Sequence, residues 1–242
     1  MTALSGHRKA ALVTGGAKRI GAGVCVRLAE MGYDIALHCF KSKSEARKTV
    51  SAVKERGVAC EVIRADLSRP ANAAKLVATA AEKLGGLSVL VNNASIFEKG
   101  GFGDITEKRL ERDMAVNFKS PFFASQQFAR GGRKGLIVNM LDARVTKNHT
   151  MHFSYNISKK CLYDFTLAAA KALGPAVRVN AVCLGPVLRE ASSSAADFKR
   201  LGAQTPLGKT GGVEHVCLAV EYLVNNQFVT GETLFVDGGQ HL

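Results

Sequence analysis

The sequence predicts a single α/β domain, doubly wound, with a seven-stranded parallel sheet and helices on both faces. Short apolar runs alternate with amphipathic helical segments from one end of the chain to the other. The runs are apolar at successive positions, as in strands that are buried on both faces. The length of 242 residues suits one large domain better than two small ones, so we expect one domain over residues 1–242.

Strands and helices are expected to alternate along the chain. The expected strands are Ala10–Thr14, Tyr33–Cys39, Val58–Ala65, Leu87–Asn92, Gly135–Leu141, Val177–Val182 and Thr233–Val236. The expected helices between them are Ile20–Met31, Ser44–Arg56, Ala71–Leu84, Thr106–Ala129, Ser154–Leu173 and Val213–Leu223. Because parallel strands joined by helices cross over in the right-handed sense, this order makes a doubly wound sheet.

Two segments outside these elements are expected to be loops at the mouth of a site. Residues 99–103 and 189–196 are rich in glycine or serine, which is typical of loops. The second belongs to a longer segment, 188–210, which we expect to be mobile and to cover a substrate. Residues 1–8 are expected to be flexible.

The composition narrows the class of protein. The net charge of +13 is compatible with nucleic-acid binding, but the basic residues are dispersed, which favours a basic surface that attracts an anionic cofactor or substrate. The sequence shows neither a membrane span nor a signal peptide. Six scattered cysteines without a CxxC pair indicate reduced thiols. We expect a cytoplasmic protein with no nucleic-acid or membrane partner and no metal site.

A glycine-rich turn joins the first strand to the first helix at Thr14–Gly21. Glycine there lets backbone N–H groups approach a pyrophosphate, and the helix N-terminus adds partial positive charge. Arg19 occupies the place of the middle glycine of the usual motif. Its guanidinium supplies charge and a planar set of donors, so we expect it to contact phosphate or substrate.

The end of the second strand indicates which dinucleotide is bound. An acidic residue there usually holds the ribose 2′-hydroxyl of NAD. The stretch His38–Lys43 contains no acid and two lysines, which suits a 2′-phosphate. The sequence therefore predicts NADPH, with Asp66 at the end of the third strand as the polar contact for adenine.

Tyr155 and Lys159 lie four residues apart in an expected helix, so both side chains lie on one face. A neighbouring cation favours phenolate, which is expected to lower the pKa of the phenol towards the range of a proton donor. The alternative is a surface tyrosine with an unrelated lysine.

Taken together, these features resemble a short-chain dehydrogenase/reductase over essentially the whole chain. The glycine-rich turn, Asn92–Ala94, Asn117, Tyr155, Lys159 and Pro186 follow the family's order and spacing. The resemblance implies a Rossmann fold. Arg19, Asp142 in place of the usual catalytic serine, and the run Asn92–Phe97 resemble the pteridine reductases, while the ending Asp237–Leu242 is similar to bacterial dihydromonapterin reductases.

The resemblance implies a role for each matching residue. The residues expected to contact NADPH are Thr14, Gly15, Lys18, Arg19, Ile20, Gly21, Phe40, Lys41, Ser42, Asp66, Leu67, Asn93, Ala94, Ser95, Lys159 and Pro186. The expected catalytic residues are Asp142, Tyr155, Lys159 and Asn117, the last holding a water for proton delivery. The expected substrate contacts are Arg19, Ser95, Phe97, Asp142 and Tyr155, with Phe97 stacked on a pterin ring. The family also implies a homotetramer, with helices 106–129 and 154–173 at a subunit interface.

The chemistry of Asp142 favours a heterocyclic substrate. An ionised aspartate in the serine position would repel the alkoxide formed when a ketone is reduced. It suits a pterin, because a carboxylate can accept hydrogen bonds from the N–H groups of the pterin and because the ring nitrogen needs a proton. The predicted reaction is hydride transfer from NADPH to a dihydropterin (dihydromonapterin, dihydrobiopterin or dihydrofolate), with Asp142 and Tyr155 as one proton relay.

Other roles stay open for several of these residues. Asp142 could cap a loop, Phe97 could belong to the core, and Asn117 could be a buried amide that satisfies backbone groups. Asp66 could cap the third helix, and Arg19 could be a tolerated surface residue.

Two other functions also stay open for the whole protein. One is an NADPH-dependent carbonyl reductase acting on 3-ketoacyl, sugar or other ketones. The other is a non-catalytic protein that senses the cofactor, although such a sensor has no need of a proton donor.

Overall fold

The computed structural model describes residues 9–189 and 193–242, and within them the chain forms one seven-stranded sheet. The strands are β1 (Ala10–Val13), β2 (Asp34–Cys39), β3 (Cys60–Arg64), β4 (Val89–Asn92), β5 (Gly135–Asp142), β6 (Val177–Leu184) and β7 (Thr233–Val236). Their order is β3-β2-β1-β4-β5-β6-β7 and every neighbouring pair is parallel. This confirms the predicted fold class. The expectation for residues 1–8 falls outside the described residues, as does part of the expected substrate loop, residues 190–192.

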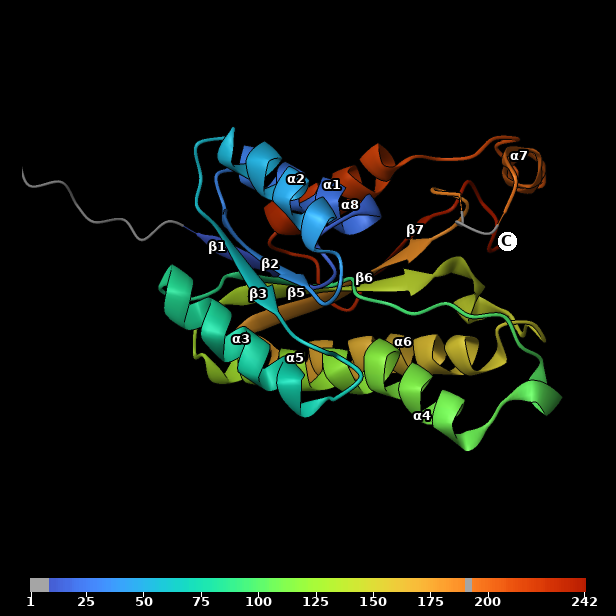
Figure 1. Cartoon of the computed structure of the whole chain (residues 1–242), viewed down its shortest axis with the longest axis horizontal. Helices are drawn as coiled ribbons and strands as arrows, with labels where there is room; N and C mark the ends of the chain where they lie inside the picture. The colour runs from blue at the N-terminus through green and yellow to red at the C-terminus, as the bar shows by residue number, and fades with distance from the viewer. Residues whose placement is uncertain (1–8, 190–192) are drawn as a thin grey trace, which may run out of the picture.

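Helices cover both faces of the sheet (Figure 1). On one face lie α1 (Arg19–Glu30), α2 (Lys43–Lys54) and α8 (Val213–Asn225); on the other lie α3 (Ala71–Leu84), α4 (Glu107–Met114), α5 (Ser120–Arg130) and α6 (Phe153–Leu173). Within the described part of the chain, no helix has the length and apolar character needed to cross a membrane.

Successive residues of the central strands belong to different hydrophobic cores, one on each face of the sheet. This explains why the strands appear in the sequence as continuous apolar runs. Val13, Val91 and Val138 belong to the core beneath α1 and α8. The residues that precede them, such as Leu12 and Leu90, belong to the core beneath α3 and α5. Because side chains alternate between the faces of a strand, both faces of the central strands are buried.

The predicted helix Thr106–Ala129 is interrupted. A π-helical turn, Ala115–Lys119, separates α4 from α5. Pro121 follows this turn, and proline has no backbone N–H to continue the regular ladder of hydrogen bonds. The turn carries Asn117, which is fully buried.

The expectation of a loop over 188–210 is wrong in part, because Ala195–Ala203 forms helix α7. Ser194 caps it by accepting from the N–H of Asp197 at 3.0 Å, while the carboxylate of Asp197 accepts from the hydroxyl of Ser194 at 2.7 Å. This reciprocal capping, together with the helix-favouring residues that follow, outweighs the serine-rich character of the segment.

Candidate functional site

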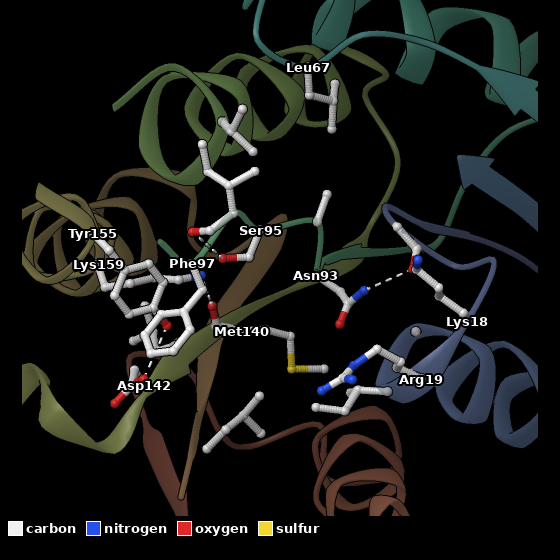
Figure 2. Close-up of a pocket in the computed structure, with 18 of the residues that line it drawn as sticks. Lys18, Arg19, Leu67, Asn93, Ser95, Phe97, Met140, Asp142, Tyr155 and Lys159 are labelled. Atoms are coloured by element: carbon white, nitrogen blue, oxygen red, sulfur yellow. Dashed lines mark hydrogen bonds between the residues drawn. The ribbon is translucent and has the colours of Figure 1, made fainter. Parts of the chain in front are cut away.

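A cavity of about 880 Å³ runs along the carboxyl edge of the sheet. Figure 2 shows Lys18 and Arg19 at one end of it and Phe97, Asp142 and Tyr155 at the other, with Asn93 between them. The residues predicted from the sequence that line the cavity are Gly15, Lys18, Arg19, Ile20, Gly21, Phe40, Lys41, Ser42, Asp66, Leu67, Asn93, Ala94, Ser95, Phe97, Asp142, Tyr155 and Lys159. Thr14, Asn117 and Pro186 are absent from this lining.

The N-terminus of α1 faces this cavity without a side-chain cap. Lys18 is the N-cap residue and makes no side-chain capping bond, so the N–H groups of the first turn lack intrahelical partners. Arg19 adopts a left-handed backbone, with φ of +57°, which is the conformation that glycine adopts most easily. A Cβ on Gly21 would lie 2.3 Å from the carbonyl oxygen of Gly15, so this close approach requires glycine. The turn fits an anionic group.

Thr14 and Gly15, two predicted cofactor contacts, use their polar groups in hydrogen bonds within the protein. Buried Thr14 accepts from the N–H groups of Asn93 and Ala94 at 2.9 and 3.0 Å, so its hydroxyl ties the end of β1 to the end of β4. The N–H of Gly15 donates to Nδ1 of His38 at 3.0 Å. Gly15 therefore lines the cavity with its N–H already bound within the protein.

The end of β2 forms the second corner of the cavity. Phe40 and Lys41 are exposed there, beside half-buried Ser42. Asp66 accepts from both the N–H and the hydroxyl of Ser68, at 2.9 and 2.7 Å, and this lowers the pKa of its carboxyl group. Asp66 therefore caps the turn before α3 rather than the helix itself, whose N-cap residue is Pro70 with no side-chain cap, and the same residue lines the cavity.

At the opposite end of the cavity, the two carboxylate oxygens of Asp142 accept hydrogen bonds from different residues, Tyr155 and Arg144. Its Oδ2 accepts from the hydroxyl of Tyr155 at 3.1 Å (Figure 2). Its Oδ1 accepts from the N–H of Arg144 at 2.9 Å, and Nε of the same arginine lies 3.4 Å away. Asp142 therefore caps the short 3-10 helix Ala143–Thr146 and also holds the phenol in the cavity wall.

The expectation that Lys159 lowers the pKa of Tyr155 is wrong in this structure. Burial, and then the charge of Asp142, raise the pKa of Tyr155 well above its usual value. Lys159 donates from Nζ to the carbonyl oxygen of Met140 at 2.8 Å, and burial lowers the pKa of this lysine to about 8. At neutral pH the phenol is therefore protonated and able to act as a proton donor.

Phe97 is half-buried and lines the cavity, so it is not a core residue. The ring of His152 stacks against it with centroids 3.9 Å apart and planes 9° apart. Tyr155 meets it edge to face at 4.6 Å. His152 thus covers one face of Phe97, while the guanidinium carbon of Arg144 lies 5.4 Å from the centroid of the same ring. A flat ligand would stack on this ring by taking the place of Arg144.

Asn117 uses its amide entirely within the protein. Its Oδ1 accepts from the hydroxyl of Ser95 and the N–H of Ile96, both at 3.0 Å. Its Nδ2 donates to the carbonyl oxygen of Ile96 and the hydroxyl of Ser158, both at 3.1 Å. The alternative of a buried amide that satisfies backbone groups describes this geometry, and the side chain fixes the segment that leads to Phe97.

Some cavity residues carried no role in the sequence analysis. His38, Arg112 and Arg144 line the cavity, and His152 supports Phe97. The spacing of three residues between His152 and Tyr155 could have indicated a shared helix face. Arg144 follows Asp142 through a 3-10 turn that has no sequence signature, and His38 looks like any polar residue in a strand.

The chain matches known proteins along almost its whole length. A family model described as enoyl-(acyl carrier protein) reductase matches residues 15–241. The structure of FolM alternative dihydrofolate reductase 1 from Brucella canis, complexed with NADP, shares 34% identity and a TM-score of 0.91, over 96% of this chain and 94% of that one.

Relatives named for other substrates are similar as well. L-2,3-butanediol dehydrogenase from Corynebacterium glutamicum is 32% identical, over 96% of this chain and 98% of the relative. A 3-oxoacyl-[acyl-carrier-protein] reductase from Staphylococcus aureus is 28% identical, over 97% and 98%. The likeness therefore extends to proteins whose names cover several kinds of substrate.

Replacing Lys159 with methionine is expected to stabilise the protein at pH 7 while abolishing turnover. The pKa of Lys159 is about 8 in the folded protein against 10.5 for an ordinary lysine, so burial of the ammonium destabilises the fold. Allowing for the lost bond to Met140, the gain is about 1–2 kcal/mol. It is fully present below pH 8 and disappears as pH rises towards 10.5.

Denaturant unfolding of both proteins at pH 7 and pH 10 tests this. Lys171→Met, on the exposed side of α6, is the control and should show no such pH dependence. A Lys159→Met protein that is less stable than the wild type at pH 7 would contradict the prediction.

Proposed function

Because the chain is an oxidoreductase of the short-chain dehydrogenase/reductase family, we propose that it uses NADPH to reduce a dihydropterin to the tetrahydro form. The observation that carries this proposal is the hydrogen bond between Tyr155 and Asp142 in the cavity wall. The likeness to a protein named alternative dihydrofolate reductase supports the same substrate class.

Three features of the cavity support NADPH as the cofactor. The uncapped N-terminus of α1 suits a pyrophosphate. Lys41 and Ser42, at the end of β2, suit a 2′-phosphate, and no acidic residue stands between His38 and Lys43. Neighbours of similar structure are NADP complexes. When bound, NADPH supplies the hydride.

The residues of the chain supply the proton and the orientation. Tyr155, protonated at neutral pH, stands beside Asp142 and is the donor to a ring nitrogen of the substrate. Asp142 accepts the phenol's hydrogen bond. After the phenol has given its proton to the substrate, the carboxylate takes a proton from solvent and passes it to the phenolate.

The aromatic and acidic groups together favour a flat heterocycle over a ketone. Phe97 lines the cavity and serves as a stacking platform when a flat ring takes the place of Arg144 over it, a contact worth roughly 1–3 kcal/mol by analogy with bases stacked on aromatic side chains. A carboxylate at position 142 opposes a developing alkoxide but accepts hydrogen bonds from the N–H groups of a pterin. The names of two relatives keep a ketone reductase as the rival function.

The proposal includes a cytoplasmic homotetramer. Leu110, Phe123, Ile157 and Leu167, on α4, α5 and α6, are each about two-fifths exposed. Exposed apolar side chains on neighbouring helices are typical of a surface that a second subunit covers. All six cysteines are free thiols, in keeping with a reducing compartment.

A spectrophotometric assay of NADPH consumption tests the function directly. The substrate panel contains dihydromonapterin, dihydrobiopterin, dihydrofolate and 3-ketoacyl and sugar ketones. We expect turnover with at least one dihydropterin and, at equal concentrations, at least tenfold less with any ketone. Turnover with ketones alone would replace the proposed reaction with the rival one.

Tyr155→Phe is expected to lower kcat by about 100- to 10,000-fold, the usual contribution of a positioned proton donor. Asp142→Ala should lower kcat strongly too, and Asp142→Asn, which keeps the shape but not the charge, separates the two effects. NADPH binding, followed by fluorescence, should remain in all three. Wild-type turnover in a protein carrying both Tyr155→Phe and Asp142→Ala would rule out the relay.

Lys41→Ala is expected to raise the KM for NADPH at least tenfold while leaving that for NADH within about twofold, because the ammonium pairs with the 2′-phosphate that only NADPH carries. Lys43→Ala, at the first residue of α2 and outside the cavity lining, is the matched control. Equal KM values for NADPH and NADH in the parent protein would contradict the assignment.

A further inference from the structure

His38 is a buried titratable residue beside the cavity that the proposed reaction does not use. It lies near the end of β2, between β1 and β3 in the sheet, and is 3% exposed. Its ring nevertheless contributes to the cavity lining. A buried imidazole needs a partner for each polar ring atom.

Both ring nitrogens of His38 have backbone partners, and these partners fix its tautomer. Nδ1 lies 3.0 Å from the nitrogen of Gly15, whose N–H can only donate. Nε2 lies 3.1 Å from the carbonyl oxygen of Ala65, which can only accept. The neutral ring with its proton on Nε2 is the one form that satisfies both. Burial also lowers the pKa of His38, which keeps the ring uncharged.

The two partners belong to opposite ends of the cofactor region. Gly15 is the first glycine of the turn before α1, and Gly16 donates its N–H to the backbone carbonyl of His38 at 2.9 Å. Ala65 directly precedes Asp66, whose carboxylate lines the adenosine end of the cavity. One rigid five-membered ring therefore spans from the loop after β1 to the loop after β3, across β2.

We propose that His38 is a positioning residue for the dinucleotide, whose neutral ring sets the separation between the phosphate-binding turn and the adenosine-binding loop. This inference rests on the proposed binding of NADPH. It assigns the phosphate contacts to the first-turn N–H groups of α1, since the N–H of Gly15 is bound to His38. The partners of the ring, Gly15 and Ala65, are not among the residues assigned to proton transfer, so its effect is expected on cofactor affinity rather than on the chemical step.

Two substitutions break the bridge at one end each. In His38→Asn the amide oxygen takes the place of Nδ1 and can accept from Gly15, but the side chain no longer reaches Ala65. In His38→Gln the amide nitrogen takes the place of Nε2 and can donate to Ala65, but the bond to Gly15 is lost. Each variant is expected to bind NADPH about five- to tenfold more weakly, the effect of one lost hydrogen bond, with kcat at saturating NADPH within about twofold.

His215→Asn is the matched control. The N–H of Gly212 donates to Nδ1 of His215 at 3.0 Å, the same bond at a site that does not line the cavity. NADPH titration followed by fluorescence, with thermal unfolding to confirm that each variant is folded, gives the comparison. A folded His38→Asn or His38→Gln protein with wild-type affinity would overturn the inference.

A measurement on the unmodified protein covers the case in which the variants do not fold. Nitrogen-15 NMR of the histidine rings at pH 7 should show His38 as a neutral Nε2–H tautomer. A charged ring or an Nδ1–H tautomer would overturn the inference alone. A wild-type protein that fails to bind NADPH would overturn the proposed function as well, so the two failures are distinguishable.

Discussion

The whole site depends on the point in the sheet where the strand order reverses, between β1 and β4. From β1 the chain proceeds outward through β2 and β3, and then returns to place β4 on the other side of β1. The loops after β1 and β4 therefore diverge, and a crevice opens between them at the carboxyl edge. The glycine-rich turn follows β1, the run Asn93–Phe97 follows β4, and Asp142 ends β5. Tyr155 and Lys159 reach the cavity from within α6, because this helix packs along β5 and β6.

Buried polar groups hold the strands that form this crevice in register. Asn92 and Asn139 are neighbours across β4 and β5, and their side chains are joined by a hydrogen bond of 2.9 Å. Asn139 then donates to Thr166 of α6 at 2.9 Å. These amides are almost fully buried, so a slip of one residue would leave them unsatisfied at a cost of several kcal/mol. The network thereby fixes the height of β5, and with it Asp142, relative to the helix that carries Tyr155.

Hydrophobic periodicity and motif spacing predicted the sheet, the helices between its strands and most of the cavity lining, because these features follow from local sequence patterns. The cavity contains Arg19, Asp142, Tyr155 and Lys159 together, as their positions at strand ends and on one helix face indicate. What the sequence could not supply depends on contacts between distant segments. The high pKa of Tyr155 needs the burial of its ring beside Asp142, and the stacking of His152 on Phe97 joins residues 55 positions apart. Helix α7 was missed for a different reason, since its capping signal lies inside a serine-rich run.

The charges around the cavity vary along its length. Lys18, Arg19, Lys41, Arg112, Arg144 and Lys159 line it, against Asp66 and Asp142. Arg112 and Lys18 are partly compensated by Glu98 and Glu45, at 2.8 and 3.9 Å, and Arg144 is compensated by Asp142. Of the cavity cations without an ion pair within the described residues, Arg19 and Lys41 lie at the end formed by α1 and β2, against the single carboxylate of Asp66, and Lys159 lies at the other end. The end suited to phosphates therefore keeps a net positive charge. The net charge of +13 does not require a nucleic-acid partner, since a cleft lined by more positive than negative side chains attracts a small anionic ligand by the same field. At the other end the carboxylate of Asp142 lies beside the protonated phenol of Tyr155. There the transfer of a proton, rather than the attraction of an anion, is the contribution of the side chains.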